Sequence, residues 1–133
     1  MTTRTMVTTR PEVFLSFAMS DREMADEVAS DLSRAGLDVV RVDELGTGSE
    51  YTDTVRSALR RSAAMVVVLS DASSAHDIPA GILFEIGAAA GAGKPIYVIV
   101  QKSTAKLPFS VPNLQVLPIT RLDEVARQLS QAA

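Results

Sequence analysis

The chain contains no cysteine and no tryptophan, and only one histidine among its 133 residues. Without cysteine it can form no disulfide bridge, no zinc-thiolate site and no thiol nucleophile. The lone histidine, His76, is expected to be a loop residue, because a metal site needs several clustered ligands. Aromatic residues make up only 5% of the chain, so aliphatic and alanine side chains must build the core. The absence of cysteine fits a reducing compartment, and we expect a cytoplasmic protein.

Clustered basic residues and long apolar runs are also missing. The net charge is −3, the isoelectric point is near 5.1 and the arginines are dispersed, so we expect no nucleic-acid partner. No apolar run approaches the roughly 20 residues of a membrane-spanning helix. The threonine- and arginine-rich start lacks the apolar stretch of a signal peptide. We expect residues 1–11 to form a flexible N-terminal arm and residues 12–133 to form a single domain.

Short apolar runs alternate with segments of helical periodicity. The expected strands cover residues 13–17, 37–42, 65–70, 96–100 and 116–119. The expected helices run from an N-cap at Ser20 to a cap at Gly36, from Tyr51 to Arg61, from an N-cap at Asp77 to Gly93 and from Arg121 to Gln131. This alternation is typical of an α/β fold with a doubly wound parallel sheet.

Two of the strands carry marks of a sheet edge. Strand 37–42 contains the charged residues Asp38 and Arg41, and strand 116–119 contains Pro118, which cannot donate to a central ladder. Right-handed crossovers then favour the strand order 2-1-3-4-5, the flavodoxin-like arrangement of five strands.

One carboxylate is isolated within a long uncharged stretch. Between Asp77 and Lys94, Glu85 is the only charged residue. On a helix, its neighbours one turn away are glycine, alanine and isoleucine, none of which can pair with an anion. Glu85 is therefore either a solvent-facing helix residue or a functional one.

The strand order predicts where a ligand would bind. Open α/β sheets bind ligands beyond the carboxyl ends of the strands, at the point where the strand order reverses. In this order the reversal lies between strands 13–17 and 65–70. The residues expected there are Ser16, Phe17, Ala18, Ser70 and Asp71, with the loop from Asp43 close by.

A carboxylate lined by small apolar residues has properties that glycosyl transfer can use. Partial desolvation raises its pKa, and no cation competes for it. Such a group can stabilise an oxocarbenium-like transition state or attack an anomeric carbon. An ordinary two-carboxylate glycosidase would need a second acid, for which Asp43, Glu44 and Asp71 are positional candidates. A pyridinium leaving group departs without protonation and needs no such acid.

Three patches of the sequence resemble a Toll/interleukin receptor (TIR) domain, and the likeness extends from about Glu12 to Leu129. The run Val-Phe-Leu-Ser-Phe at 13–17 is similar to the opening box of the family, with Glu12 where an aspartate is more usual. Asp43-Glu44-Leu45 with Gly46 and Gly48 looks like the BB loop. Phe84-Glu85-Ile86 matches a glutamate followed by an aliphatic residue on the helix after the third strand.

The resemblance implies an activity and a site. In enzymatic TIR domains this glutamate cleaves the nicotinamide-ribose bond of NAD, giving ADP-ribose or a cyclised product, so Glu85 would be catalytic, with NAD as substrate and no cofactor. The family often has a tryptophan four residues before the glutamate, where this chain has Gly81. The expected substrate-binding residues are Ser16, Phe17, Ala18, Asp43, Leu45, Gly46, Gly48, Ser70 and Gly81.

The resemblance also implies partners, and it leaves alternatives open. It implies self-association with other TIR domains, a separate sensor or effector protein, and a role in immune or antiphage signalling. A non-catalytic TIR-TIR interaction module is one alternative. Another is a nucleoside or nucleotide N-glycosidase, because residues 85–95 look like nucleoside 2-deoxyribosyltransferases, although the Asp-x-Gly-Thr segment of those enzymes is missing.

Overall fold

The computed structural model describes residues 10–45, 51–70, 78–102, 107 and 109–131. Its strands are β1 (Glu12–Phe17), β2 (Asp38–Arg41), β3 (Ala64–Val68), β4 (Ile96–Val100) and β5 (Leu114–Pro118). Its α-helices are α1 (Arg22–Arg34), α2 (Tyr51–Arg61), α3 (Ala80–Gly91) and α4 (Leu122–Gln131). The predicted elements therefore form: β4 and α2 have the predicted bounds, and the ends of the others differ by up to three residues. Residues 1–9 of the predicted N-terminal arm lie outside the described residues.

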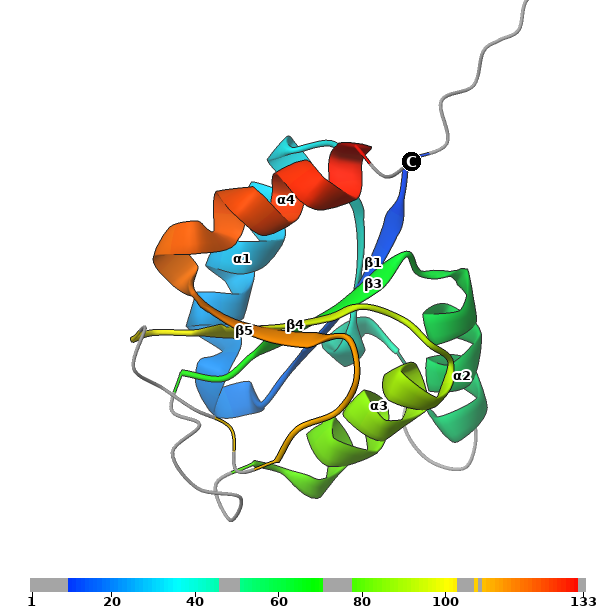
Figure 1. Ribbon diagram of the computed structural model, residues 1–133. Coiled ribbons are helices and arrows are strands. Elements are labelled where there is room, and N and C mark those ends of the chain that lie inside the picture. Colours follow the sequence, from blue (N-terminus) through cyan, green and yellow to red (C-terminus); the bar gives the residue numbers. More distant parts are fainter. Residues whose placement is uncertain (1–9, 46–50, 71–77, 103–106, 108, 132–133) are drawn as a thin grey trace, which may run out of the picture.

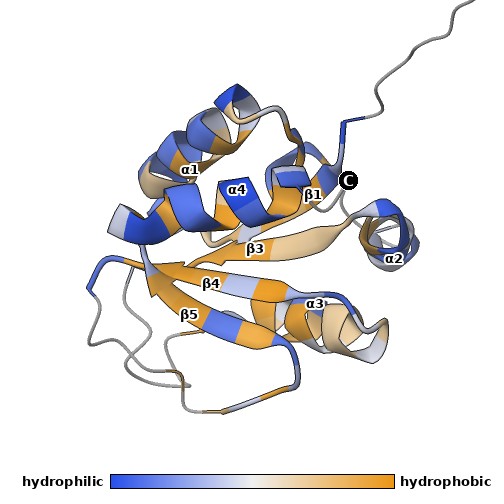
Figure 2. Cartoon of the chain, turned by 45° about the horizontal axis from the view of Figure 1, so that its top comes forward, coloured by the Kyte–Doolittle hydropathy of each residue, from blue (hydrophilic) through white to orange (hydrophobic). Residues whose placement is uncertain are grey.

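The five strands form one parallel sheet in the order β2-β1-β3-β4-β5. This order confirms the predicted flavodoxin-like topology, with β2 and β5 at the edges. β3 and β4 are buried along their whole length, as expected for central strands that lack polar alternation. Figure 2 shows apolar residues concentrated along these strands.

Helices cover both faces of the sheet and create two apolar clusters (Figure 1). On one face, α1 and α4 pack against alternate residues of β1, including Leu15 and Phe17. On the other face, α2 and α3 pack against Phe14 and the inward residues of β3 and β4. Because successive strand residues point to opposite faces, Ser16 lies on the α2 and α3 side. The candidate site is built on that side.

The helix starts differ from the sequence prediction. Ser20 is not the N-cap of α1: a 3-10 turn covers Met19–Asp21, and Asp21 occupies the cap position without a side-chain capping bond. The Asp21 carboxylate instead accepts hydrogen bonds from the backbone N–H of Ser70, at 3.3 Å, and from its hydroxyl. A tertiary contact has replaced the local cap. Similarly, Pro79 takes the cap position of α3, and the predicted cap Asp77 lies outside the described residues.

Candidate active site

Glu85 lies on the inward face of α3 and is buried, with only 1% of its surface exposed. The apolar residues Ile82, Ile86 and Ala89 share this face and belong to the cluster beneath α2 and α3. The interpretation of Glu85 as a solvent-facing helix residue is therefore wrong. A buried carboxylate needs polar partners to offset the loss of hydration.

Two hydroxyl groups supply those partners, one to each carboxylate oxygen. The Ser16 hydroxyl of β1 donates to Oε1 of Glu85, and the Tyr51 hydroxyl at the start of α2 donates to Oε2. Within the described ranges, Glu85 forms no ion pair. The carboxylate is thus held by neutral donors from two neighbouring elements.

Burial controls the ionisation of this group. Desolvation raises the pKa of Glu85 above its ordinary value of 4.5, and the hydrogen bonds from Ser16 and Tyr51 partly offset that rise. Burial also raises the pKa of the Tyr51 phenol, and its bond to Glu85 raises it further. The phenol therefore stays protonated and able to donate.

The Glu85 cluster lies toward the carboxyl end of the central strands. Ser16 and Phe17, the last two residues of β1, pair with Val67 and Val68, the last two of β3. These two strands flank the predicted reversal of strand order. The structure therefore brings Ser16 and Glu85 together at this reversal.

The other residues expected at the site lie in different surroundings. Ala18 and Leu45 are half-buried and pack against the cluster that contains the inward face of α3. Gly81 is exposed on α3, one turn before Glu85. Phe17 points to the opposite face of the sheet, into the cluster beneath α1 and α4, where the Arg41 guanidinium lies 5.1 Å from its ring centre.

The polar side chains of Asp43 and Ser70 are engaged elsewhere. Asp43 pairs with Arg41 at 3.1 Å and with Arg22 at 3.8 Å. Ser70 bonds to Asp21. Gly46, Gly48, Asp71 and His76 lie outside the described residues. Among the described residues, therefore, the Glu85 cluster contains a single carboxylate.

Tyr51 is the residue of this cluster that the sequence prediction missed. The sequence placed it correctly at the start of a helix, yet 34 positions separate it from Glu85. Its one sequence signal is rarity, since it is one of only two tyrosines in the chain. Rarity alone indicates no partner.

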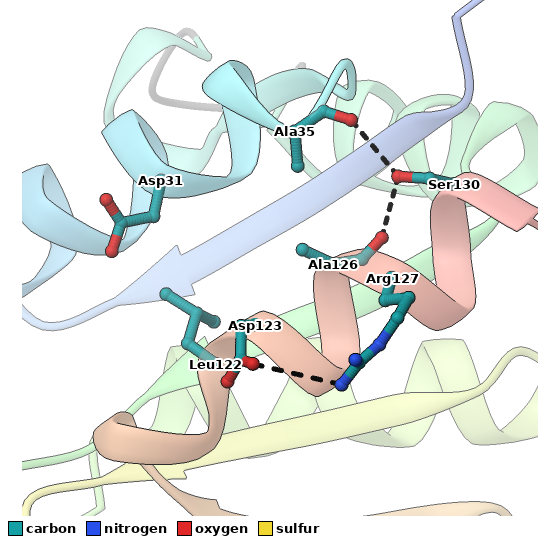
Figure 3. Close-up of a pocket in the computed structure, with 7 residues that line it drawn as sticks. All are labelled: Asp31, Ala35, Leu122, Asp123, Ala126, Arg127 and Ser130. Carbon is teal, nitrogen blue, oxygen red and sulfur yellow. Dashed lines mark hydrogen bonds and ion pairs between the residues drawn. The ribbon is translucent and has the colours of Figure 1, made fainter.

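A separate hollow lies between α1 and α4, on the other side of the sheet from Glu85 (Figure 3). The Ser130 hydroxyl there donates to the carbonyls of Ala35 and Ala126, at 3.1 and 2.7 Å, and so ties α4 to α1. Arg127 pairs with Asp123 at 3.8 Å. Only the bond from Ser130 to Ala35 joins the two helices, since the other two contacts lie within α4, and the described residues that line the hollow include no buried charged side chain.

Neither a metal-ligand cluster nor a membrane-spanning helix is present in the described part of the chain. Its described residues contain no group of three or more histidine, aspartate or glutamate side chains able to hold a metal ion. Within them, no helix is both long enough and apolar enough to cross a membrane.

Solved structures of similar shape come from several kinds of protein. A response regulator receiver domain protein from Bacillus halodurans is 16% identical, with a TM-score of 0.60 over 91% of this chain and 97% of its own. The CMP N-glycosidase BcmB from Clostridium botulinum is 17% identical, with a TM-score of 0.58 over 89% and 97%. The RPS4 and RRS1 TIR domain heterodimer matches with 13% identity and a TM-score of 0.58 over 90% and 96%. At these identities the likeness establishes the fold alone.

The sequence decides among these proteins where shape does not. No curated protein matches it closely enough to be counted as a relative. The model of the TIR domain family, however, matches residues 13–131, nearly the whole of the chain. This match confirms the resemblance found in the three sequence patches, and the chain belongs to the TIR domain family.

Proposed function

We propose that this TIR domain hydrolyses the nicotinamide-ribose bond of NAD, with Glu85 as the catalytic carboxylate. One observation carries the proposal: an isolated carboxylate with 1% exposure is held by two hydroxyl donors beside the carboxyl ends of the central strands. Because no cation among the described residues pairs with Glu85, its ionised form is available to a developing positive charge. Membership of the TIR family supports NAD as the substrate.

The chemistry needs only one carboxylate. When the bond between the anomeric carbon and the pyridinium nitrogen breaks, its electron pair goes to the nitrogen and nicotinamide leaves as a neutral molecule. Glu85 stabilises the oxocarbenium ion or bonds to its anomeric carbon. Water then adds to that carbon, displacing the Glu85 carboxylate where a bond to it has formed, and loses a proton to give ADP-ribose, whereas attack by a group of the same molecule gives a cyclised product. The cluster of described residues, with its single carboxylate, matches this requirement.

Assembly and cellular role belong to the same proposal. The RPS4 and RRS1 TIR domains form a heterodimer, which supports association of this domain with other TIR domains. We place it in the cytoplasm, in immune or antiphage signalling, with a separate sensor or effector protein.

The direct test measures nicotinamide release from NAD at several concentrations of purified protein, by liquid chromatography. We expect release that rises more steeply than the protein concentration, and loss of release in Glu85→Gln. The matched control is Glu27→Gln, because Glu27 is an exposed glutamate on α1. No release at any concentration, or equal release by Glu85→Gln, would refute the assignment.

A second candidate function is hydrolysis of the N-glycosidic bond of a nucleotide such as CMP. The structural likeness to the CMP N-glycosidase favours this function, because Glu85 would act on the same type of bond, an N-glycosidic bond. Incubation with CMP, dCMP and a panel of deoxynucleosides separates the two functions by the base that is released. Release of cytosine without nicotinamide would replace the NAD assignment.

A non-catalytic interaction module is the third candidate, favoured by the TIR heterodimer. It predicts concentration-dependent association without turnover of any nucleotide. Sedimentation of the protein and of Leu45→Ala would measure that association, because Leu45 belongs to the segment that resembles the BB loop, through which an interaction module would contact other TIR domains. Turnover that depends on Glu85 would exclude a purely non-catalytic role.

A further inference from the structure

The two hydroxyls that hold Glu85 come from elements with unequal freedom to move. Ser16 is fully buried in β1, which is paired on both sides, by β2 and by β3. Tyr51 is half-buried and is the first residue of α2, so it lies at the end of its element and not in the middle. Displacing Ser16 would disturb the centre of the sheet, whereas the Tyr51 side chain can turn toward water.

The buried carboxylate creates a problem of access. A reacting carboxylate oxygen must come within about 3–3.5 Å of the anomeric carbon. In the structure Oε1 is bonded by Ser16 and Oε2 by Tyr51, and Glu85 is 1% exposed. Each oxygen keeps a second lone pair, so the obstacle is the burial itself, and a side chain that covers the carboxylate must move before substrate can meet it. Leaving the buried Ser16 hydroxyl unpaired costs more than moving a half-buried phenol into water.

We propose that Tyr51 is a positioning residue that holds Glu85 in the empty site and gives way to the substrate. Oε2 is then the oxygen that faces the anomeric carbon, while Ser16 keeps its bond to Oε1 throughout. This inference rests on the proposed function, because it assigns roles to the two oxygens of the same carboxylate.

The ionisation of Glu85 reports whether each donor is present. Among the described residues, those that face Glu85 from the elements packed against it are Ser16 of β1, Tyr51 of α2 and apolar residues of β3, and its neighbours on α3 carry no charge. Each hydroxyl bond favours the ionised carboxylate, so removing either one raises the pKa of Glu85. The pH profile of kcat/KM reports the free enzyme, and that of kcat reports the substrate complex.

The two donors therefore predict different pH profiles. Tyr51→Phe should move the acid limb of kcat/KM to higher pH and leave the acid limb of kcat in place, because the phenol has already left the complex. At pH values well above the acid limb of kcat/KM, Tyr51→Phe should also lower KM by about three- to tenfold, because substrate no longer has to displace a hydrogen bond. Ser16→Ala should move the acid limbs of both kcat/KM and kcat to higher pH, because the bond from Ser16 to Glu85 persists in the substrate complex.

The experiment combines these profiles with a titration that needs no activity. Carboxyl-labelled glutamate is followed by NMR in the wild type, Tyr51→Phe and Ser16→Ala, with the Glu85 signal identified by its loss in Glu85→Gln. The matched control is Tyr97→Phe, because Tyr97 is the other tyrosine and bonds to Gln128 at 3.1 Å, away from Glu85. Both test variants should raise the pKa of Glu85, and the control should not.

Two results would overturn the inference: an unchanged Glu85 titration in Tyr51→Phe, or a shift of its kcat limb equal to that of kcat/KM. If no nucleotide is turned over, the proposed function fails, and the titration still decides whether Tyr51 holds the carboxylate. If Ser16→Ala does not fold, as judged by circular dichroism, the two profiles of Tyr51→Phe decide the question alone.

Discussion

Ser16 and Glu85 are joined by a hydrogen bond inside the protein although 69 positions separate them in the sequence. The bond connects a central strand to the helix that covers it. Its partners are fully buried or nearly so, with exposures of 0% and 1%. It therefore contributes to the stability of the fold as well as to the geometry of the candidate active site.

Ser16→Ala should lower the free energy of unfolding by about 1–3 kcal/mol, because a buried carboxylate loses one of its two donors. Urea denaturation followed by circular dichroism measures this loss. The matched control is Ser62→Ala, whose equally buried hydroxyl donates to the Ala58 carbonyl at 2.7 Å. That carbonyl keeps a backbone hydrogen bond from Ser62 N–H at 3.0 Å. Equal losses for the two variants would contradict a special role for the carboxylate.

Glu85 should make the stability of the protein depend on pH in a defined direction. Its folded-state pKa is raised above the ordinary 4.5, so its contribution is fully present below pH 4.5 and is lost as pH rises through the folded pKa. In that window the loss is at most about 1.4 kcal/mol per pH unit. Glu85→Gln removes this effect, so its stability relative to the wild type should increase with pH above 4.5.

Denaturation of both proteins at several values between pH 4 and 8 measures this difference. Glu27→Gln is the control, because an exposed glutamate should give a nearly constant difference from the wild type. A constant difference for Glu85→Gln across the same range would show that Glu85 is not destabilised by burial in its charged form.

The central strands and the isolated carboxylate could be predicted because their signals are local. An apolar run such as residues 65–69 is typical of a strand buried on both faces. A proline within a strand, such as Pro118, indicates a strand at the edge of the sheet. Glu85 was recognisable because it is the only charge in a long stretch. The strand order followed from the two edges and the handedness of the crossovers.

The parts that sequence patterns missed depend on contacts between distant residues. Ser20 is followed at the correct spacing by Glu23, yet α1 starts later because Asp21 bonds to Ser70, 49 positions away. The role of Tyr51 was hidden for the same reason. No local pattern reveals that this residue meets a carboxylate on another helix.

Gly93 should be sensitive to substitution because it ends α3 with φ at +72°. In this conformation it allows the backbone N–H of Lys94 to reach the Ala89 carbonyl at 3.0 Å. Gly93→Ala should cost about 1–2 kcal/mol of stability, because a side chain is strained in the left-handed region. Gly87→Ala is the control: Gly87 lies in the same helix with open space at its Cβ, and alanine there should add about 0.5–1 kcal/mol. Thermal denaturation should move in opposite directions for the two variants.

Gly81 offers a test of the proposed NAD hydrolysis in which activity should increase. It lies exposed one turn before Glu85, and a Cβ at this position meets no heavy atom within 4 Å. Gly81→Trp would supply the aromatic residue that many TIR domains carry there, and stacking on a base contributes about 1–3 kcal/mol. We therefore expect KM for NAD to fall by roughly fivefold or more, with kcat little changed. Gly87→Trp places the same ring elsewhere on α3, and Gly81→Ala separates the effect of the ring from that of a more stable helix. An unchanged KM in a correctly folded Gly81→Trp would mean that substrate does not pass beside this turn of α3.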